Sequence, residues 1–217
     1  MTAPLLSVED ITLQIRGETV LREVSLTCSP GEVVGITGRN GSGKSMLFKC
    51  IAGLCLPQVG EIVVDGFPVV SRRRFPPDLG VLIEKPGFLG ALSAYENLAV
   101  LASIQDRVGR SEILDALRVV GLSEHAQKRV RVFSLGMKQR LGIAQAIMER
   151  PRLVILDEPT SGLDGAGVEM LRRLVADLRE RGAAVLVASH LAEDIAALCD
   201  RSLHMEAGRL GDPAREN

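Results

Sequence analysis

The pattern of hydrophobic and polar positions predicts short strands in the first part of the chain. Val8–Ile15 and Val20–Cys28 alternate partly between apolar and polar residues around a turn at Gly17-Glu18. Asp65-Gly66 is typical of a hairpin turn between two further strands. The predicted strands of this part are Val8–Ile15, Val20–Cys28, Val33–Thr37, Glu61–Val64, Phe67–Val70 and Leu79–Ile83.

Helical periodicity dominates the middle of the chain. Apolar residues recur three and four positions apart there, as expected for helices with one buried face. Two continuously apolar strands follow, at Leu153–Leu156 and Ala183–Ala188, and a short final pair is expected at Ser202–Met205 and Arg209-Leu210. The predicted helices are Lys44–Leu54, Ala94–Ile104, Ser111–Val120, Leu135–Glu149 and one that carries Val168, Leu171, Leu174, Val175 and Leu178 on a single face.

This order of elements predicts an α/β fold with a largely parallel sheet. Strands that alternate with helices usually pair in parallel, and strands without polar residues are buried on both faces. We expect a single domain, 1–217, in which residues 1–83 and 151–217 form the core together with an antiparallel β subdomain. Residues 84–150 are expected to form an inserted α-helical subdomain.

Composition and charge narrow the function classes. Hydrophobic residues make up 46% and charged residues 24%, as in an ordinary globular protein. A formal net charge of -1 and an aromatic content of 3% give no sign of a nucleic-acid partner. No apolar run approaches the ~18 residues that a membrane-spanning helix needs. The four cysteines form no Cys-x-x-Cys pair, which favours buried thiols over a metal site.

A glycine-rich segment stands between a predicted strand and a predicted helix, and residues 38–45 fit the pattern Gly-x-x-x-x-Gly-Lys-Ser/Thr. In such a phosphate loop the backbone N–H groups, Lys44 and the Ser45 hydroxyl hold a triphosphate and Mg²⁺. The core is therefore predicted to be of the P-loop NTPase type, with ATP and Mg²⁺ as its cofactors. A glycine turn that binds a stray anion is the alternative. The expected nucleotide-binding residues are Gly38, Arg39, Asn40, Gly41, Ser42, Gly43, Lys44, Ser45 and Met46.

Two carboxylates, Asp157 and Glu158, end the apolar strand that begins at Leu153. If this strand lies beside the phosphate-loop strand, Asp157 comes close to the metal ion that Ser45 holds. Glu158 then points towards the γ-phosphate, where a carboxylate can deprotonate the attacking water. A solvated acidic strand end is the alternative.

Taken together, these residues resemble the ATP-binding cassette (ABC) ATPases, the motor subunits of ABC transporters. The resemblance runs from about Leu5 to Leu210, and residues 133–140 stand where that family carries its signature Leu-Ser-Gly-Gly-Gln. Ser134 and Gly136 keep the family identities, so the resemblance implies that they face the γ-phosphate bound by a second subunit. It thus implies a dimer that sandwiches two ATPs. An ordinary helix cap at Ser134 is the alternative.

Other positions match the family or depart from it. The loop 161–164 resembles the one that crosses the dimer interface, with Asp164 as its acidic member, and His190 matches the switch histidine that contacts the γ-phosphate. Glu84 stands where the family usually has a glutamine that contacts Mg²⁺. Arg16 stands where an aromatic residue normally stacks on adenine, and a guanidinium can take that place.

The resemblance implies an ATP-binding and ATP-hydrolysing subunit that powers transport through a separate membrane permease. Lys44, Glu158 and His190 are its expected catalytic residues, and Ser45, Asp157 and Glu84 its expected Mg²⁺ ligands. The expected location is cytoplasmic, on the inner face of the cell membrane through the permease. The alternatives are a soluble ABC ATPase of translation or DNA repair and a regulatory nucleotide-binding module. A likeness to the bacitracin- and lantibiotic-immunity exporters rests on Glu84, Pro86-Gly87-Phe88, Tyr95-Glu96-Asn97-Leu98 and Ser134-Leu135-Gly136-Met137.

Overall fold

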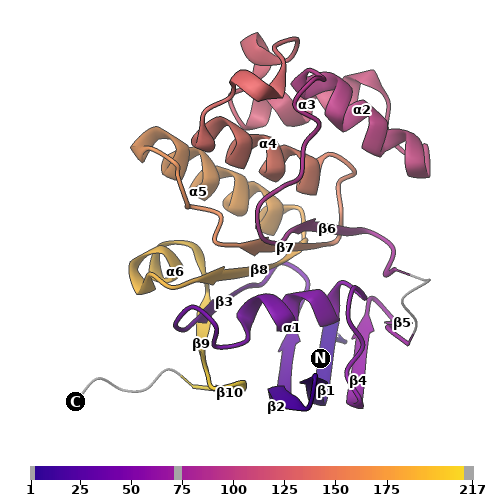
Figure 1. Ribbon diagram of the computed structural model, residues 1–217, viewed down its shortest axis with the longest axis vertical. Helices are drawn as coiled ribbons and strands as arrows, with labels where there is room; N and C mark the ends of the chain where they lie inside the picture. Colours follow the sequence, from indigo (N-terminus) through magenta and orange to yellow (C-terminus); the bar gives the residue numbers. More distant parts are fainter. Residues whose placement is uncertain (1–2, 71–74, 213–217) are drawn as a thin grey trace.

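The computed structural model describes residues 3–70 and 75–212, which form two sheets and a set of helices (Figure 1). The strands are β1 Leu6–Ile15, β2 Glu18–Cys28, β3 Val33–Thr37, β4 Val59–Val64, β5 Phe67–Pro68, β6 Leu79–Leu82, β7 Leu153–Asp157, β8 Ala184–Ser189, β9 Arg201–Glu206 and β10 Arg209–Gly211. The helices are α1 Lys44–Ile51, α2 Ala94–Gln105, α3 Arg110–Val119, α4 Leu135–Ile147, α5 Gly165–Glu180 and α6 Ala192–Leu198. Short 3₁₀ helices occur at Ser123–His125 and Val130–Val132.

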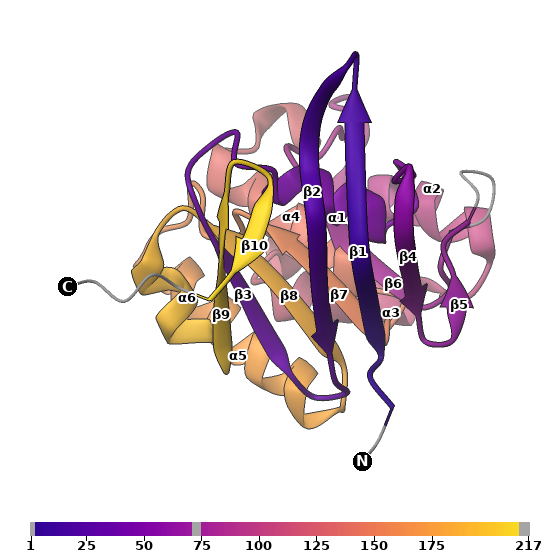
Figure 2. The same ribbon diagram turned by 90° about the horizontal axis from the view of Figure 1, so that it is seen from below.

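The larger sheet has the strand order β10-β9-β3-β8-β7-β6, and its strands from β9 to β6 run parallel. The smaller sheet, β2-β1-β4-β5, is antiparallel throughout, and its long β1–β2 hairpin crosses beneath the larger sheet (Figure 2). Helix α1 lies between the two sheets (Figure 1). The expected parallel core and antiparallel β subdomain are therefore confirmed.

One detail of the expected sheet is wrong. The strand that ends in the two carboxylates, β7, does not lie beside the phosphate-loop strand β3, because β8 pairs with both and separates them. Strand β8, which follows both β3 and β7 in the sequence, lies between them in the sheet. Crossover connections through helices allow such an order.

The strands of the larger sheet are apolar throughout because both faces are covered. On β8, Val185 and Val187 pack with the helices α2 to α5, whereas Ala184 and Leu186 pack with α1 and the smaller sheet. Each face of the larger sheet therefore carries its own hydrophobic core. Together the two cores hold in place the strand ends that meet the phosphate loop.

Some element boundaries differ from the predicted ones for local reasons. Helix α1 ends at Ile51, because Gly53 takes a positive φ of 74°. Strand β5 is shorter than expected because Pro68 has no N–H to donate, although Val69 N still donates to Ile62 O at 2.8 Å. Helix α6 was not predicted, and Ile195 is its one buried residue.

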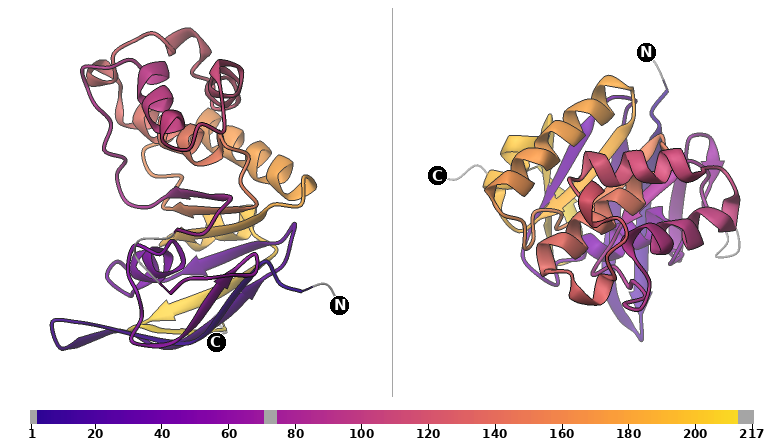
Figure 3. Two further views of the ribbon diagram at one scale, coloured as in Figure 1. Left: turned by 90° about the vertical axis from the view of Figure 1, so that its right-hand side faces the viewer. Right: turned by 90° about the horizontal axis from the view of Figure 1, so that it is seen from above.

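Helices α2, α3 and α4 of the expected insert gather at one end of the molecule, above the larger sheet (Figure 3). The boundaries at 84 and 150 stay predictions. Within the described parts of the chain, no helix combines the length and the apolar character needed to cross a membrane.

Candidate functional site

The phosphate loop joins the end of β3 to the start of α1. Gly38 has a φ of 146°, and a Cβ there would lie 2.3 Å from Met205 O on β9. Any other residue would therefore push the loop off the neighbouring strand. Lys44 is only 5% exposed, and its Nζ donates to Gly38 O at 2.6 Å and to Arg39 O at 3.1 Å. The loop is thus held closed around its own lysine.

Ser45 and Asp157 meet although their strands are separated. Helix α1 passes across the sheet to β7, and Ser45 Oγ donates to Asp157 Oδ2 at 2.5 Å. Asp157 is 6% exposed, and its Oδ1 is buried without a hydrogen-bond partner among residues 3–70 and 75–212. Burial raises the pKa of this carboxyl above its usual range. A buried carboxylate oxygen left unpaired beside a hydroxyl fits a hard divalent cation such as Mg²⁺, which takes oxygen ligands.

Glu158 follows directly and is fixed by the end of β8. Its carboxylate accepts hydrogen bonds from His190 N at 3.0 Å and lies 2.8 Å from His190 Nδ1. Its own backbone is held as well, since Gln139 Nε2 donates to Glu158 O at 3.0 Å. The structure therefore brings two of the expected catalytic residues, Glu158 and His190, into direct contact.

Glu84 lies just beyond the end of β6 and takes a positive φ of 60°. Its Oε1 accepts a hydrogen bond from Lys49 Nζ of α1 at 2.5 Å, while its side chain stays 62% exposed. This expected metal ligand is thus engaged by a lysine that the sequence analysis did not single out.

One cavity of about 450 Å³ is lined by Lys44, Ser45, Glu84, Asp157 and Glu158, whereas Lys49 and His190 lie outside its lining. Its walls contain positive charge from Lys44 and Lys85 and negative charge from Glu84, Asp157 and Glu158. The lining consists of Val20, Asn40, Gly41, Gly43, Lys44, Ser45, Met46, Glu84, Lys85, Gln139, Asp157, Glu158 and Ser161. The structure thus joins most of the expected phosphate, metal and catalytic residues in one place.

The expected signature residues form a separate cluster. Ser134 Oγ caps α4 by accepting from Met137 N at 3.2 Å, and a Cβ at Gly136 would lie 2.6 Å from Gly162 O. Asp164 caps α5, accepting from Gly167 N at 2.8 Å, and this hydrogen bond lowers the pKa of its carboxyl. None of Ser134, Gly136 and Asp164 lines the phosphate cavity of its own chain.

Arg16 also stays apart from the phosphate cavity. It is exposed in the turn between β1 and β2, with a φ of 54°, whereas Val20 of the same hairpin lines the cavity wall. Stacking of Arg16 on a base remains a prediction.

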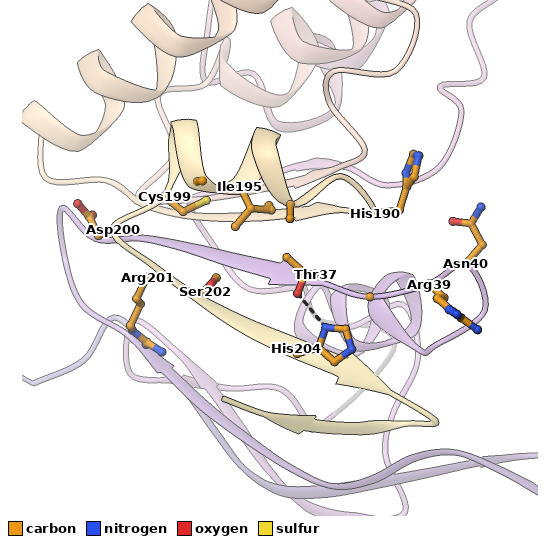
Figure 4. A pocket seen from close by; sticks show the side chains of 13 residues that line it. Thr37, Arg39, Asn40, His190, Ile195, Cys199, Asp200, Arg201, Ser202 and His204 are labelled. Atoms are coloured by element: carbon orange, nitrogen blue, oxygen red, sulfur yellow. Dashed lines mark hydrogen bonds between the residues drawn. The ribbon is translucent and has the colours of Figure 1, made fainter. Parts of the chain in front are cut away.

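A second cavity, of about 930 Å³, lies on the other side of the phosphate loop between α6, β3 and β9 (Figure 4). His190 and Arg39 stand at its rim, and Asn40 borders both cavities. Thr37 Oγ1 lies 3.0 Å from His204 Nδ1 and ties β3 to β9 immediately before the loop. The ends of β3 and β9 therefore support the phosphate loop on the side of this second cavity.

Comparison with known proteins identifies the chain. A family model described as ABC transporter matches residues 21–161, more than half of the sequence. This chain belongs to the ABC transporter family. The uncharacterized ABC transporter ATP-binding protein YybJ of Bacillus subtilis (strain 168) is 40% identical over 206 residues, covering 95% of this chain and 94% of the relative.

Other relatives of this ABC ATPase have more specific names. The bacitracin transport ATP-binding protein BcrA of Enterococcus faecalis is 37% identical and covers 95% of this chain and 68% of the relative. The lantibiotic transport ATP-binding protein SrtF of Streptococcus pyogenes is 36% identical, and the match covers 90% of this chain and 84% of the relative. The expected likeness to bacitracin and lantibiotic transport ATPases is confirmed.

Solved structures agree with this assignment. The ATP-binding subunit of an ABC transporter superposes with a TM-score of 0.84 at 29% identity, covering 96% of this chain and 90% of that chain. A post-hydrolysis dimer of the ATP-binding cassette MJ0796, bound to ADP and Pi, has a TM-score of 0.84 at 25% identity. The match covers 94% of this chain and 96% of that chain. The chain is an ATP-binding and ATP-hydrolysing subunit of an ABC transporter. These relatives and neighbours do not support the alternatives of a soluble non-transport ATPase or a regulatory module.

Four residues of the site have no role among the sequence-based expectations: Val20, Lys85 and Gln139 line the cavity, and Lys49 bonds Glu84. Gln139 lies within the signature segment 133–140, whose pattern assigns it no role, and nothing in the sequence marks Val20 or Lys85 as a wall residue. Lys49 could have been found, because it lies four positions after Ser45 and such residues share one face of a helix.

Proposed function

We propose that this ABC ATPase binds Mg-ATP in the phosphate cavity and hydrolyses it with Glu158 as the base. The observation that carries the proposal is the buried Asp157 carboxylate, which bonds Ser45 at 2.5 Å and keeps an unpaired oxygen beside Glu158. Ser45 and Asp157 would hold Mg²⁺, and Glu84 lines the same cavity. Bound there, the ion would offset charge on the β- and γ-phosphates.

The hydrolytic step follows from the contacts of Glu158. Its carboxylate accepts a proton from the attacking water, the water oxygen bonds to the γ-phosphorus, and ADP leaves with the broken bond's electrons. His190 is hydrogen-bonded to that carboxylate through both N and Nδ1. It therefore orients the base, while Lys44 holds the phosphates in line.

We further propose that two copies complete each site. Ser134, Gly136 and Asp164 lie outside the cavity of their own chain, as residues that serve a partner's nucleotide would. The dimeric cassette MJ0796 among the structural neighbours supports this arrangement. Dimer closure around ATP and opening after hydrolysis then form the power stroke.

The membrane partner is proposed to dock where the insert joins the core. An apolar groove of about 340 Å³ runs along residues 81–89 and α2 there, and Leu89 and Val100 on its wall are 58% and 49% exposed. A permease segment in this groove would hold the ATPase at the inner face of the membrane, without any contact to nucleic acid. The relatives named for bacitracin and lantibiotic transport support a role in transport, and export is proposed as its direction on the resemblance to the immunity exporters.

Replacing Glu158 with glutamine tests this proposal. Glutamine keeps the shape but cannot accept the proton, so we expect the ATPase rate to fall at least about 100-fold. ATP binding should survive, and light scattering coupled to size exclusion should show an ATP-dependent dimer.

Glu180→Gln, at an exposed position of α5, serves as the matched control and should behave like the wild type. A Glu158→Gln protein that hydrolyses ATP normally would contradict the role of Glu158. ATPase activity measured with and without the membrane protein then tests the coupling, because an ATPase that drives a permease responds to it.

A further inference from the structure

Helix α1 is tied to the larger sheet by two polar contacts, one turn apart. Ser45 bonds Asp157 at the end of β7, and Lys49, four residues later, bonds Glu84 beyond the end of β6. The strands β6 and β7 are neighbours, with Leu82 paired to Leu156. The second contact therefore repeats the first at the next strand of the sheet.

A carboxylate at position 84 creates an electrostatic difficulty for this site. Glu84 lines the phosphate cavity, where Asp157 and Glu158 already contribute negative charge. A triphosphate adds several more negative charges, and like charges in a partly enclosed cavity repel. Against these carboxylates and the triphosphate, the cavity lining supplies two cations, Lys44 and Lys85.

We propose that Lys49 is a positioning residue that makes Glu84 compatible with nucleotide binding. Its ammonium holds the Glu84 carboxylate at 2.5 Å and neutralises it, so that the pair adds almost no net charge to the cavity. Lys49 lies outside the cavity lining and so acts through Glu84 rather than on the phosphates. This inference rests on the proposed nucleotide site and assigns to Lys49 the control of that site's charge.

The expected effect is moderate because both partners are partly exposed. The side chain of Lys49 is 25% exposed and that of Glu84 is 62% exposed, so water screens the pair. Removing the ammonium should weaken nucleotide binding roughly two- to fivefold at low salt. Added salt should reduce that loss, because mobile ions screen the exposed carboxylate.

A double-mutant cycle tests the coupling. Calorimetric titration with Mg·AMP-PNP, which is not hydrolysed, compares the wild type with Lys49→Met, Glu84→Gln and the double variant. We expect Lys49→Met to lose affinity only while Glu84 is present, and Glu84→Gln to restore it in the double variant. Lys49→Arg, which keeps the charge, should bind like the wild type.

An equal loss in both backgrounds would overturn the proposal, since Lys49 would then act on the nucleotide or on α1 directly. No loss in Lys49→Met would overturn it as well. Lys128→Met, at an exposed lysine of the insert, is the matched control for lost positive charge. Lys44→Ala is tested separately: if it binds Mg·AMP-PNP as the wild type does, the proposed nucleotide site fails, whatever the cycle shows.

Discussion

Asp157 keeps a buried oxygen that no other described residue hydrogen-bonds, and such a group is costly in the absence of a ligand. The cost is visible in its raised pKa, which burial causes. Ser45 satisfies only the other oxygen. The side chain is thus arranged for what it binds rather than for the stability of the free protein, a common trade at functional sites.

Asp157→Asn should therefore stabilise the nucleotide-free protein at neutral pH by about 1 kcal/mol, or a few degrees in Tm. The sign follows from the raised folded pKa: ionisation of Asp157 disfavours the folded state, and this penalty is complete only above that pKa. The difference between variant and wild type should shrink as the pH falls towards the unfolded pKa. Scanning calorimetry across this range measures it.

The same variant should lose the additional stabilisation that Mg-ATP gives to the wild type. A variant less stable than the wild type at neutral pH would contradict this account of Asp157.

Between elements, the start of α4 and the loop before α5 are packed backbone to backbone. Gly136 leaves no room for a Cβ beside Gly162 O, and Arg140 donates to Asp164 at 2.7 Å across the same contact. Gln139 also reaches the backbone of Glu158 from α4. We therefore expect these contacts to link the position of α4 to the catalytic strand end.

Gly136→Ala should destabilise the protein by about 1–3 kcal/mol, because its Cβ would overlap Gly162 O. Nucleotide affinity of the single chain should stay within about twofold, since Gly136 does not line the cavity, while ATPase activity falls. Gly165→Ala is the matched control, as a Cβ there meets nothing within 4 Å. Equal effects of the two substitutions would argue against a special role of the Gly136 contact.

At the scale of the whole molecule, the helical insert and the core meet at the groove proposed for the permease. The exposed Leu89 and Val100 there are large apolar side chains, and Lys85 lines both this groove and the nucleotide cavity. The same segment, 81–89, thus borders both the groove and the nucleotide site. We therefore expect this segment to couple the groove to the nucleotide site.

Leu89→Asp should weaken binding of the membrane partner at least about tenfold, because a charge would replace an apolar contact. The ATPase rate of the isolated subunit should stay within about twofold. Co-purification with the permease partner measures the first and a phosphate-release assay the second. Val119→Asp, an exposed valine of α3, should leave both unchanged.

The sequence by itself determined the local features of this protein. Periodicity and turn residues predicted nearly all helices and strands, and the pattern of residues 38–45 predicted the phosphate loop. These signals are local because they depend on neighbours along the chain. Helix α6 escaped, since a short helix with one buried residue leaves hardly any periodic signal. The family followed from motifs at fixed positions.

Only the tertiary structure decided which strands are neighbours and which charges meet. It placed β8 between β3 and β7, and α1 across the sheet, so that Ser45 reaches Asp157 from a distant part of the chain. It also paired Lys49 with Glu84 and set the signature residues apart from their own cavity. Such contacts depend on sheet order and on packing between distant segments, and a one-dimensional pattern does not encode these distances.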